Sequence, residues 1–248
     1  MTTEMKKAET LRNFLFRPDF KLSVGYGTKE SPCSLGAINL CLENEWKDSI
    51  PDGMSYVVGS YIRGMQDDMP EYMRNSEEWK EGLVLSINTG QDFEKERHDM
   101  LVDWFWDVVM VNVQPIADSV GYEKEWKKFL CNRSTFPDNP VGSPPKVPLD
   151  WNSTQTYNKQ IKKIPSPDEL QRINKIKDAL IDVSCYAEKV QGCGINKYTM
   201  SMACSCYLGI LSSMYSIRHI LSLMGRPETD VYEESDPVFL LHKLCNLY

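Results

Sequence analysis

The sequence predicts a mostly α-helical protein that folds as a single globular helical domain. Apolar residues recur at helical spacing, most clearly in the stripe Met54, Val57, Val58, Tyr61, Ile62 and Met65. Helix start and stop signals separate several such segments, and no segment shows the sustained alternation of a β-strand. The pattern also permits a minor N-terminal strand or hairpin.

The N-terminal part is expected to mix irregular chain with helices. Residues 9–32 contain the turn Arg17-Pro18-Asp19 and the glycine-containing stretch VGYGTKESP, with a short strand expected at most over 20–25. The segment CSLGAINLCLENEW predicts a helix, and IPDGMS predicts a turn before the apolar stripe.

The stretch GMQDDMPEYMRNSEEW, residues 64–79, places a dense group of charges between helices. Asn75 or Ser76 can cap the helix that follows, so part of this polarity is helix-end chemistry. The interpretation favoured here is that the stretch mainly holds two helices in register. The strongest helical pattern then covers about 92–119, and Pro115 is expected to kink or end that helix.

A proline-rich stretch divides the rest of the chain. Residues 132–165 contain six prolines and are predicted to be a linker or long loop between region 1–131 and region 166–248, with the second region packing on the first. Ser166-Pro167-Asp168-Glu169 predicts a helix start. Further helices are expected at 195–224 and at the C-terminal DPVFLLHKL.

Composition limits the classes of function. The 248-residue chain has a net charge of −7, which disfavours general nucleic-acid binding because such binders need a basic face. Eight cysteines without a C-x-x-C pair, and no apolar leader, predict reduced thiols and a cytoplasmic protein. The uncharged run 198–217 contains five serines, so it is expected to be a buried helix of a non-membrane protein.

Sequence motifs for known chemistry are missing. The chain has no dinucleotide-binding, phosphate-loop, nucleophile-elbow or H-E-x-x-H motif, so no cofactor, metal or catalytic residue is assigned. The carboxylates of Asp67, Glu96, Asp99 and Asp103 support one alternative, a metal-dependent enzyme, if the chain folds them together.

Several segments taken together resemble a protein family encoded in phage and prophage genomes. These are CSLGAINL, IPDGMSYVVGSYIRGMQDDMPEYMRNSEEW, NTG, ERHDMLVDWFWDVVMVNVQPIAD and DPVFLLHKL. Family members usually have an alanine-rich helical C-terminal half, from which residues 132–235 depart. The resemblance implies a phage setting and the host-cell cytoplasm, but it supplies no mechanism.

The resulting hypothesis is a phage accessory interaction protein, such as a counter-defence factor, that binds a host protein or sequesters a small, nucleotide-like signalling molecule. An arginine would contact phosphate and an aromatic ring the base. A structural phage component is the third alternative, and a homo-oligomer is left open. The candidate ligand-binding residues are Arg63, Gln66, Asp67, Arg74, Asn75, Glu96, Arg97, Asp103, Trp104 and Trp106.

Overall fold

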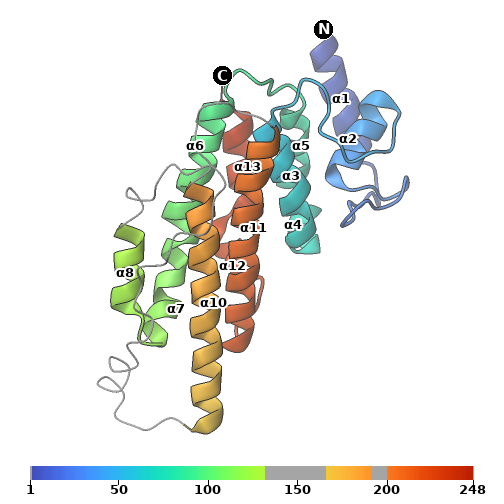
Figure 1. The fold of residues 1–248 in the computed structure, drawn as a ribbon. Coiled ribbons are helices and arrows are strands. Elements are labelled where there is room, and N and C mark those ends of the chain that lie inside the picture. Colours follow the sequence, from blue (N-terminus) through green and yellow to red (C-terminus); the bar gives the residue numbers. More distant parts are fainter. Residues whose placement is uncertain (1, 132–165, 192–199, 248) are drawn as a thin grey trace. The chain divides into compact units, whose positions relative to one another are not determined.

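The computed structural model describes residues 2–131, 166–191 and 200–247, and these ranges are mostly helical (Figure 1). The predicted fold class is therefore confirmed. No strand occurs within the described ranges, where residues 20–25 form a loop and one isolated bridge pairs Gly27 with Pro32. The expected linker at 132–165 lies outside the described residues.

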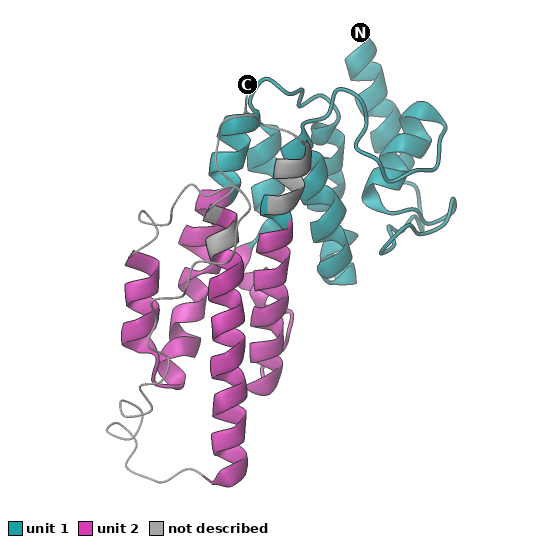
Figure 2. Ribbon diagram, in the orientation of Figure 1, with its two compact units in different colours: residues 1–101, 195–207, 236–248 teal, residues 102–194, 208–235 magenta. Residues whose placement is uncertain are grey.

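The chain divides into two compact units (Figure 2). Unit 1 contains residues 1–101, 195–207 and 236–248, and unit 2 contains residues 102–194 and 208–235. Each unit therefore combines segments that are far apart in the sequence.

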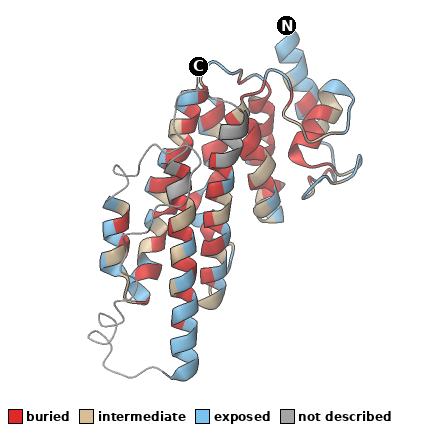
Figure 3. Cartoon of the chain, in the orientation of Figure 1, coloured by how far each residue is buried: buried red, intermediate tan, exposed pale blue. Residues whose placement is uncertain are grey.

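Unit 1 is a group of short helices around an apolar core (Figure 3). Its helices are α1 (Thr3–Leu15), α2 (Ser34–Glu43), α3 (Tyr56–Asp68), α4 (Glu71–Arg74), α5 (Glu77–Ser86), α6 (Glu94–Trp104) up to Leu101, and α13 (Pro237–Cys245). Helix α5 packs against α1 and α13, and α3 packs against α2 and α13. The C-terminal helix is thus part of the same core as the N-terminal helices.

Side-chain caps fix where the helices of unit 1 begin. Ser76 Oγ accepts a hydrogen bond from the N–H of Trp79 at 3.0 Å, which confirms the predicted start of α5. Ser55 Oγ accepts from the N–H of Val58 in the same way at the start of α3. Each cap satisfies a backbone donor that has no partner within its helix.

In unit 2 the helix expected over 92–119 is interrupted well before Pro115. After α6 the chain forms a π-helical turn, η1 (Phe105–Val109), in which the N–H of Met110 donates to the carbonyl of Phe105 at 2.9 Å. A 3₁₀ turn, η2 (Val111–Val113), and helix α7 (Gln114–Ser119) follow. Pro115 lies in the first turn of α7, where its missing N–H breaks no hydrogen bond.

The π-helical turn begins between two nearby tryptophans that are both buried. On an ordinary α-helix, side chains two residues apart are rotated by about 200° around the helix axis, so they lie on nearly opposite faces. Trp104 and Trp106 are nevertheless both buried, and the Trp106 ring lies 5.7 Å from the ring of Phe129 in α8 (Glu123–Cys131). The altered helical winding after Trp104 accompanies this double burial.

The remaining helices of unit 2 include two long ones. They are α10 (Pro167–Gln191), α11 (Met200–Leu223) from Leu208 onward, and α12 (Asp230–Ser235). Ser166 Oγ accepts from the N–H of Glu169, as predicted for the start of α10. None of the helices in the described ranges combines the length and the hydrophobicity that a bilayer crossing needs. Helix α11 is mostly buried where its side chains are described, but Leu208 and Tyr215 are exposed.

Candidate functional site

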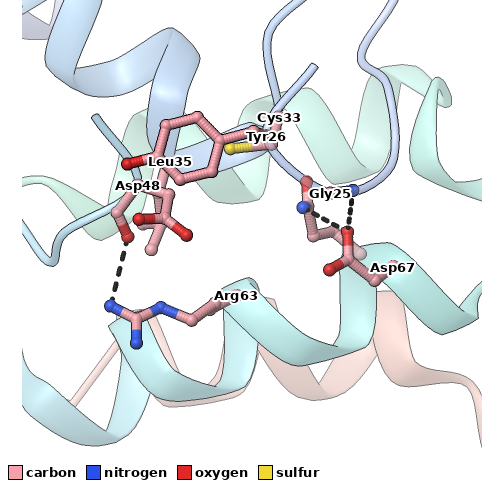
Figure 4. A pocket seen from close by; sticks show the side chains of 8 residues that line it. Gly25, Tyr26, Cys33, Leu35, Asp48, Arg63 and Asp67 are labelled. Atoms are coloured by element: carbon pink, nitrogen blue, oxygen red, sulfur yellow. Dashed lines mark hydrogen bonds between the residues drawn. The ribbon is translucent and has the colours of Figure 1, made fainter. Parts of the chain in front are cut away.

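A cavity of about 160 Å³ lies in unit 1 between α2, α3 and the two loops that flank α2 (Figure 4). It is lined by Gly25, Tyr26, Cys33, Leu35, Asp48, Arg63, Gln66 and Asp67. Three of these, Arg63, Gln66 and Asp67, are candidate residues from the sequence. They project from the C-terminal half of α3, and the other lining residues come from the loops and from α2.

The loop that carries Tyr26 is shaped by two glycines with positive φ. Gly25 has φ 59° and Gly27 has φ 62°, a region that residues with a side chain rarely adopt. A Cβ atom at Gly27 would lie 2.3 Å from the carbonyl oxygen of Ser31, so only glycine fits the closed loop. Asp67 Oδ1 accepts a hydrogen bond from the N–H of Gly25 at 2.7 Å and joins the loop to α3. Figure 4 shows this bond at one end of the cavity.

Gln66 forms part of the cavity wall, and both the oxygen and the nitrogen of its amide are hydrogen-bonded within the protein. Its Oε1 accepts from the N–H of Ser34 in the first turn of α2 at 2.6 Å, and its Nε2 donates to Asp67 Oδ1 at 2.6 Å. The side chain is 2% exposed. Gln66 therefore positions α2 and Asp67 relative to α3.

Arg63 has unused hydrogen-bonding capacity inside the cavity. Its Nη2 donates to the backbone carbonyl of Asp48 at 3.1 Å, as Figure 4 shows. Its Nε is buried and has no hydrogen-bond partner. Within the described part of the chain, no ion pair joins Arg63 to the carboxylate of Asp48 or of Asp67. An unpaired buried donor costs roughly 1–3 kcal/mol, so the guanidinium group of Arg63 is not fully satisfied within the protein.

Cys33 lines the cavity but is not arranged as a nucleophile. Its Sγ caps α2 by accepting a hydrogen bond from the N–H of Gly36 at 3.1 Å. Burial raises the pKa of the thiol, the hydrogen bond from Gly36 opposes this shift, and the Asp48 and Asp67 carboxylates add smaller effects that also raise the pKa. The thiol stays protonated at neutral pH, whereas nucleophilic attack needs the thiolate.

Two aromatic rings stand near the cavity. Tyr26 is 52% exposed and Trp46 is 37% exposed, and their ring centroids are 5.7 Å apart in an edge-to-face arrangement. Because Tyr26 lines the cavity while much of its ring faces solvent, it forms part of the entrance.

Arg74 and Asn75 are held by the backbone. Arg74 is 7% exposed, and its Nη1 donates to the carbonyls of Gln66 at 2.8 Å and Met69 at 3.0 Å. Asn75 Oδ1 accepts from the N–H of Leu22 at 2.7 Å. Burial lowers the pKa of Arg74, with Glu71 and Asp67 opposing the shift. These bonds fix the 20–32 loop and α4 against α3, as expected for residues that hold the chain in register.

Arg97 is also committed to the backbone. This fully buried side chain donates to the carbonyls of Thr89 at 2.6 Å, Gly90 at 3.1 Å and Leu244 at 2.9 Å. Burial lowers its pKa, and the nearby Glu94 carboxylate opposes the shift. Arg97 therefore ties the loop before α6 to the C-terminal helix of unit 1.

The other candidates do not line the cavity. Glu96 and Asp103 are exposed on α6. Trp104 and Trp106 belong to the core of unit 2, where Trp104 Nε1 donates to the carbonyl of Ser235 at 2.7 Å. The described residues contain no group of three His, Cys, Asp or Glu side chains that could hold a metal ion.

Sequence reasoning missed five of the eight residues that line the cavity. Gly25 and Tyr26 had a usable signal, since Gly-Tyr-Gly is typical of a tight loop that presents its central residue. Cys33, Leu35 and Asp48 gave none, because only the packing of α2 against α3 brings them to Arg63.

Comparison with known proteins adds no further information on the site. No family model, no curated protein and no solved structure matches the chain. Any function must therefore be inferred from the chemistry of the cavity.

Proposed function

We propose that the protein is a binding protein that captures a small polar molecule in the cavity of unit 1. The observation behind this proposal is that Arg63 lines a cavity of about 160 Å³ with a guanidinium group that is only partly hydrogen-bonded, since Nη2 donates to the Asp48 carbonyl and the buried Nε has no partner. A ligand that brings a hydrogen-bond acceptor to the guanidinium group uses this remaining capacity. Binding pockets commonly combine apolar walls with a few convergent polar groups, and Leu35, Tyr26 and Arg63 supply this combination.

The same cavity gives little support to catalysis. No histidine lines it, and its one cysteine is buried with a raised pKa. The described residues also bring no metal-binding group together. The lining side chains can hold and orient a ligand, and Cys33, the one thiol among them, is held in the protonated form that does not attack.

The resemblance to the phage-encoded family supplies the biological setting of the proposal. Cys33, Leu35, Arg63, Gln66 and Asp67 all lie in the segments that carry the resemblance. In a phage accessory protein, capture of a small host molecule would act by lowering its free concentration. Counter-defence by sequestration is the form of this activity that we propose.

Binding of a host protein is the second candidate function. It is favoured by two exposed aromatic side chains, Tyr26 at the entrance of the cavity and Trp46 in contact with it. Large aromatic side chains of this kind are enriched at protein interfaces. Loss of a co-purified host protein from the Trp46→Ala variant, with the small ligand retained, would favour this candidate.

Native mass spectrometry of gently purified protein tests the first candidate. We expect a small extra mass on the wild-type chain that is lost from Arg63→Gln. Arg172→Gln is the matched control, because Arg172 is exposed on α10 of unit 2 and the substitution removes the same charge. An extra mass that both variants retain would place the ligand elsewhere and refute the proposed site.

A further inference from the structure

The charges around the cavity are arranged in an unusual way that bears on the chemistry of the ligand. One cationic side chain, Arg63, and two anionic ones, Asp48 and Asp67, line a single small space. No ion pair within 4.0 Å joins the arginine to either aspartate in the described ranges. Opposite charges that share a cavity without neutralising each other can each contact a different group of one ligand.

These side chains differ in the hydrogen-bonding groups that they leave unused. Arg63 Nε is a buried donor without a partner. The Asp48 carboxylate accepts no hydrogen bond from the described residues, and Asp67 uses Oδ1 for Gly25 and Gln66 but leaves Oδ2 open. The ligand that fits must carry both an acceptor and one or more donors.

Arg63 and Asp48 are also close enough to contact one small molecule. Arg63 Nη2 lies 3.1 Å from the main-chain carbonyl of Asp48, and the side chains of both residues line the cavity. Figure 4 shows both groups at the same end of the cavity. The partly exposed Tyr26 ring lines the same space and can face a cation.

Size and charge argue against a phosphorylated nucleotide at this position. A cavity of about 150 Å³ holds a molecule the size of benzene, so about 160 Å³ has no room for a base, a sugar and phosphates together. The cavity walls carry two carboxylates against one guanidinium, which disfavours an anion. Arg74 and Arg97, the other arginines considered for phosphate, donate to backbone carbonyls.

We propose that the ligand is a small zwitterion of the free α-amino acid class, an inference that rests on the proposed binding function. Its carboxylate accepts a hydrogen bond from the Arg63 guanidinium group, and its ammonium group donates to the Asp48 carboxylate, with Asp67 Oδ2 and the Tyr26 ring nearby. No bond is made or broken in this step. The remaining space beside Leu35 takes the side chain of the ligand and limits its size.

Isothermal titration calorimetry with the full chain tests this inference. The probes are the individual proteinogenic amino acids and, for the tightest of them, its methyl ester and its N-acetyl derivative. The methyl ester lacks the anionic carboxylate and the N-acetyl form lacks the ammonium group. We expect each derivative to bind at least about tenfold more weakly than the free amino acid, as loss of a charge-assisted hydrogen bond predicts.

Two variants test which side chain contacts each charged group of the ligand. In Arg63→Gln the amino acid and its methyl ester should bind with similar affinity, because the partner of the carboxylate is gone. In Asp48→Asn, which keeps the shape and the main-chain carbonyl held by Arg63, the amino acid and its N-acetyl derivative should bind similarly. Preserved discrimination in either variant would overturn the assignment. Arg172→Gln should bind all three probes like the wild type.

The same titrations distinguish two outcomes: the ligand is not a zwitterion, or the cavity binds no ligand at all. Binding of uracil or guanosine, but of no amino acid, with loss in Arg63→Gln, would refute the zwitterion and leave the cavity as a binding site. Binding of simple amines as tightly as amino acids would also refute it. Absence of binding for every probe, together with no extra mass in the native spectrum, would refute both proposals.

Discussion

Arg74 donates from Nη1 to the backbone carbonyl of Gln66 at 2.8 Å, so a residue in α4 fixes the last turn of α3. The same guanidinium reaches the carbonyls of Met69 and Leu22. It thus joins the 20–32 loop to the helix that carries Arg63 and Asp67. The polar stretch 64–79 thus holds the frame of the cavity in place, and the cavity-lining side chains of Arg63 and Asp67 lie just before the stretch and near its start.

We expect Arg74→Ala to lower the free energy of unfolding by about 2–3 kcal/mol, because three buried carbonyl groups lose a charged donor. Urea denaturation measures this loss. Arg172→Ala, at an exposed position of α10, should change the free energy by less than about 0.5 kcal/mol. Unchanged stability of Arg74→Ala would show that its bonds do not hold the loop, and Arg74 would return to the list of ligand-contacting residues.

The elements of the fold were more predictable than the site because their signals are local. Ser76 and Ser166 cap α5 and α10 as their sequence context indicates, since capping depends on residues within one helical turn. The hydrogen-bond partners of the arginines could not be predicted from local sequence in this way. Arg74 and Arg97 look like ligand contacts in the sequence, but their acceptors are backbone carbonyls, which no residue type marks.

The break in the 92–119 helix shows a second limit of local reasoning. Pro115 is the obvious breaker in the sequence, yet the chain leaves regular α-helix ten residues earlier, at Phe105. No residue type in 105–109 marks this change of winding, which falls in a segment where Trp104, Phe105 and Trp106 are all buried. Similarly, Asp48 reaches Arg63 only through the packing of α2 against α3.

Trp104 offers a test of the core of unit 2. We expect Trp104→Ala to lower the free energy of unfolding by about 3–5 kcal/mol, because it removes a buried ring that is 9% exposed. Trp104→Phe keeps much of the volume but leaves the Ser235 carbonyl without its indole donor, so its cost should be smaller, about 1–2 kcal/mol. If the alanine variant does not fold, the phenylalanine variant gives the answer. Equal stability of the phenylalanine variant and the wild type in urea would show that the Ser235 bond contributes nothing.

Two glycines in one loop provide a matched pair for the wall of the cavity. Gly25 and Gly27 have nearly the same positive φ, but a Cβ atom has open space at Gly25 and would meet the Ser31 carbonyl at 2.3 Å at Gly27. Gly25→Ala should cost about 1–2 kcal/mol from its backbone conformation alone. Gly27→Ala should cost a further 1–3 kcal/mol, roughly, from overpacking.

The thermal and chemical denaturation of the two glycine variants checks this difference. The affinity for the ligand should also fall more in Gly27→Ala than in Gly25→Ala, since displacing this loop moves Tyr26 at the cavity entrance. Equal effects of the two substitutions on stability would show that the loop relaxes around the added methyl group.

The buried His98 is expected to make the stability of the protein depend on pH. Burial lowers the pKa of this histidine in α6, and the nearby Asp99 carboxylate opposes the shift. The unfolded-state pKa is about 6.5. Because the folded-state pKa lies below it, the unfolded chain binds more protons as the pH falls through about 6.5, and the free energy of unfolding must decrease on acidification.

Urea denaturation at about pH 7.5, 6.5 and 5.5 brackets this titration. The loss of stability toward low pH should be smaller in His98→Gln than in the wild type, because glutamine does not titrate. Carboxylates held by cations, such as Glu71 beside Lys21, lose their stabilising contribution only at lower pH, since that bond lowers the pKa of Glu71. The same substitution at the exposed His219 is the control for the loss of a histidine. A slope in His98→Gln as steep as in the wild type would assign the pH dependence to other groups.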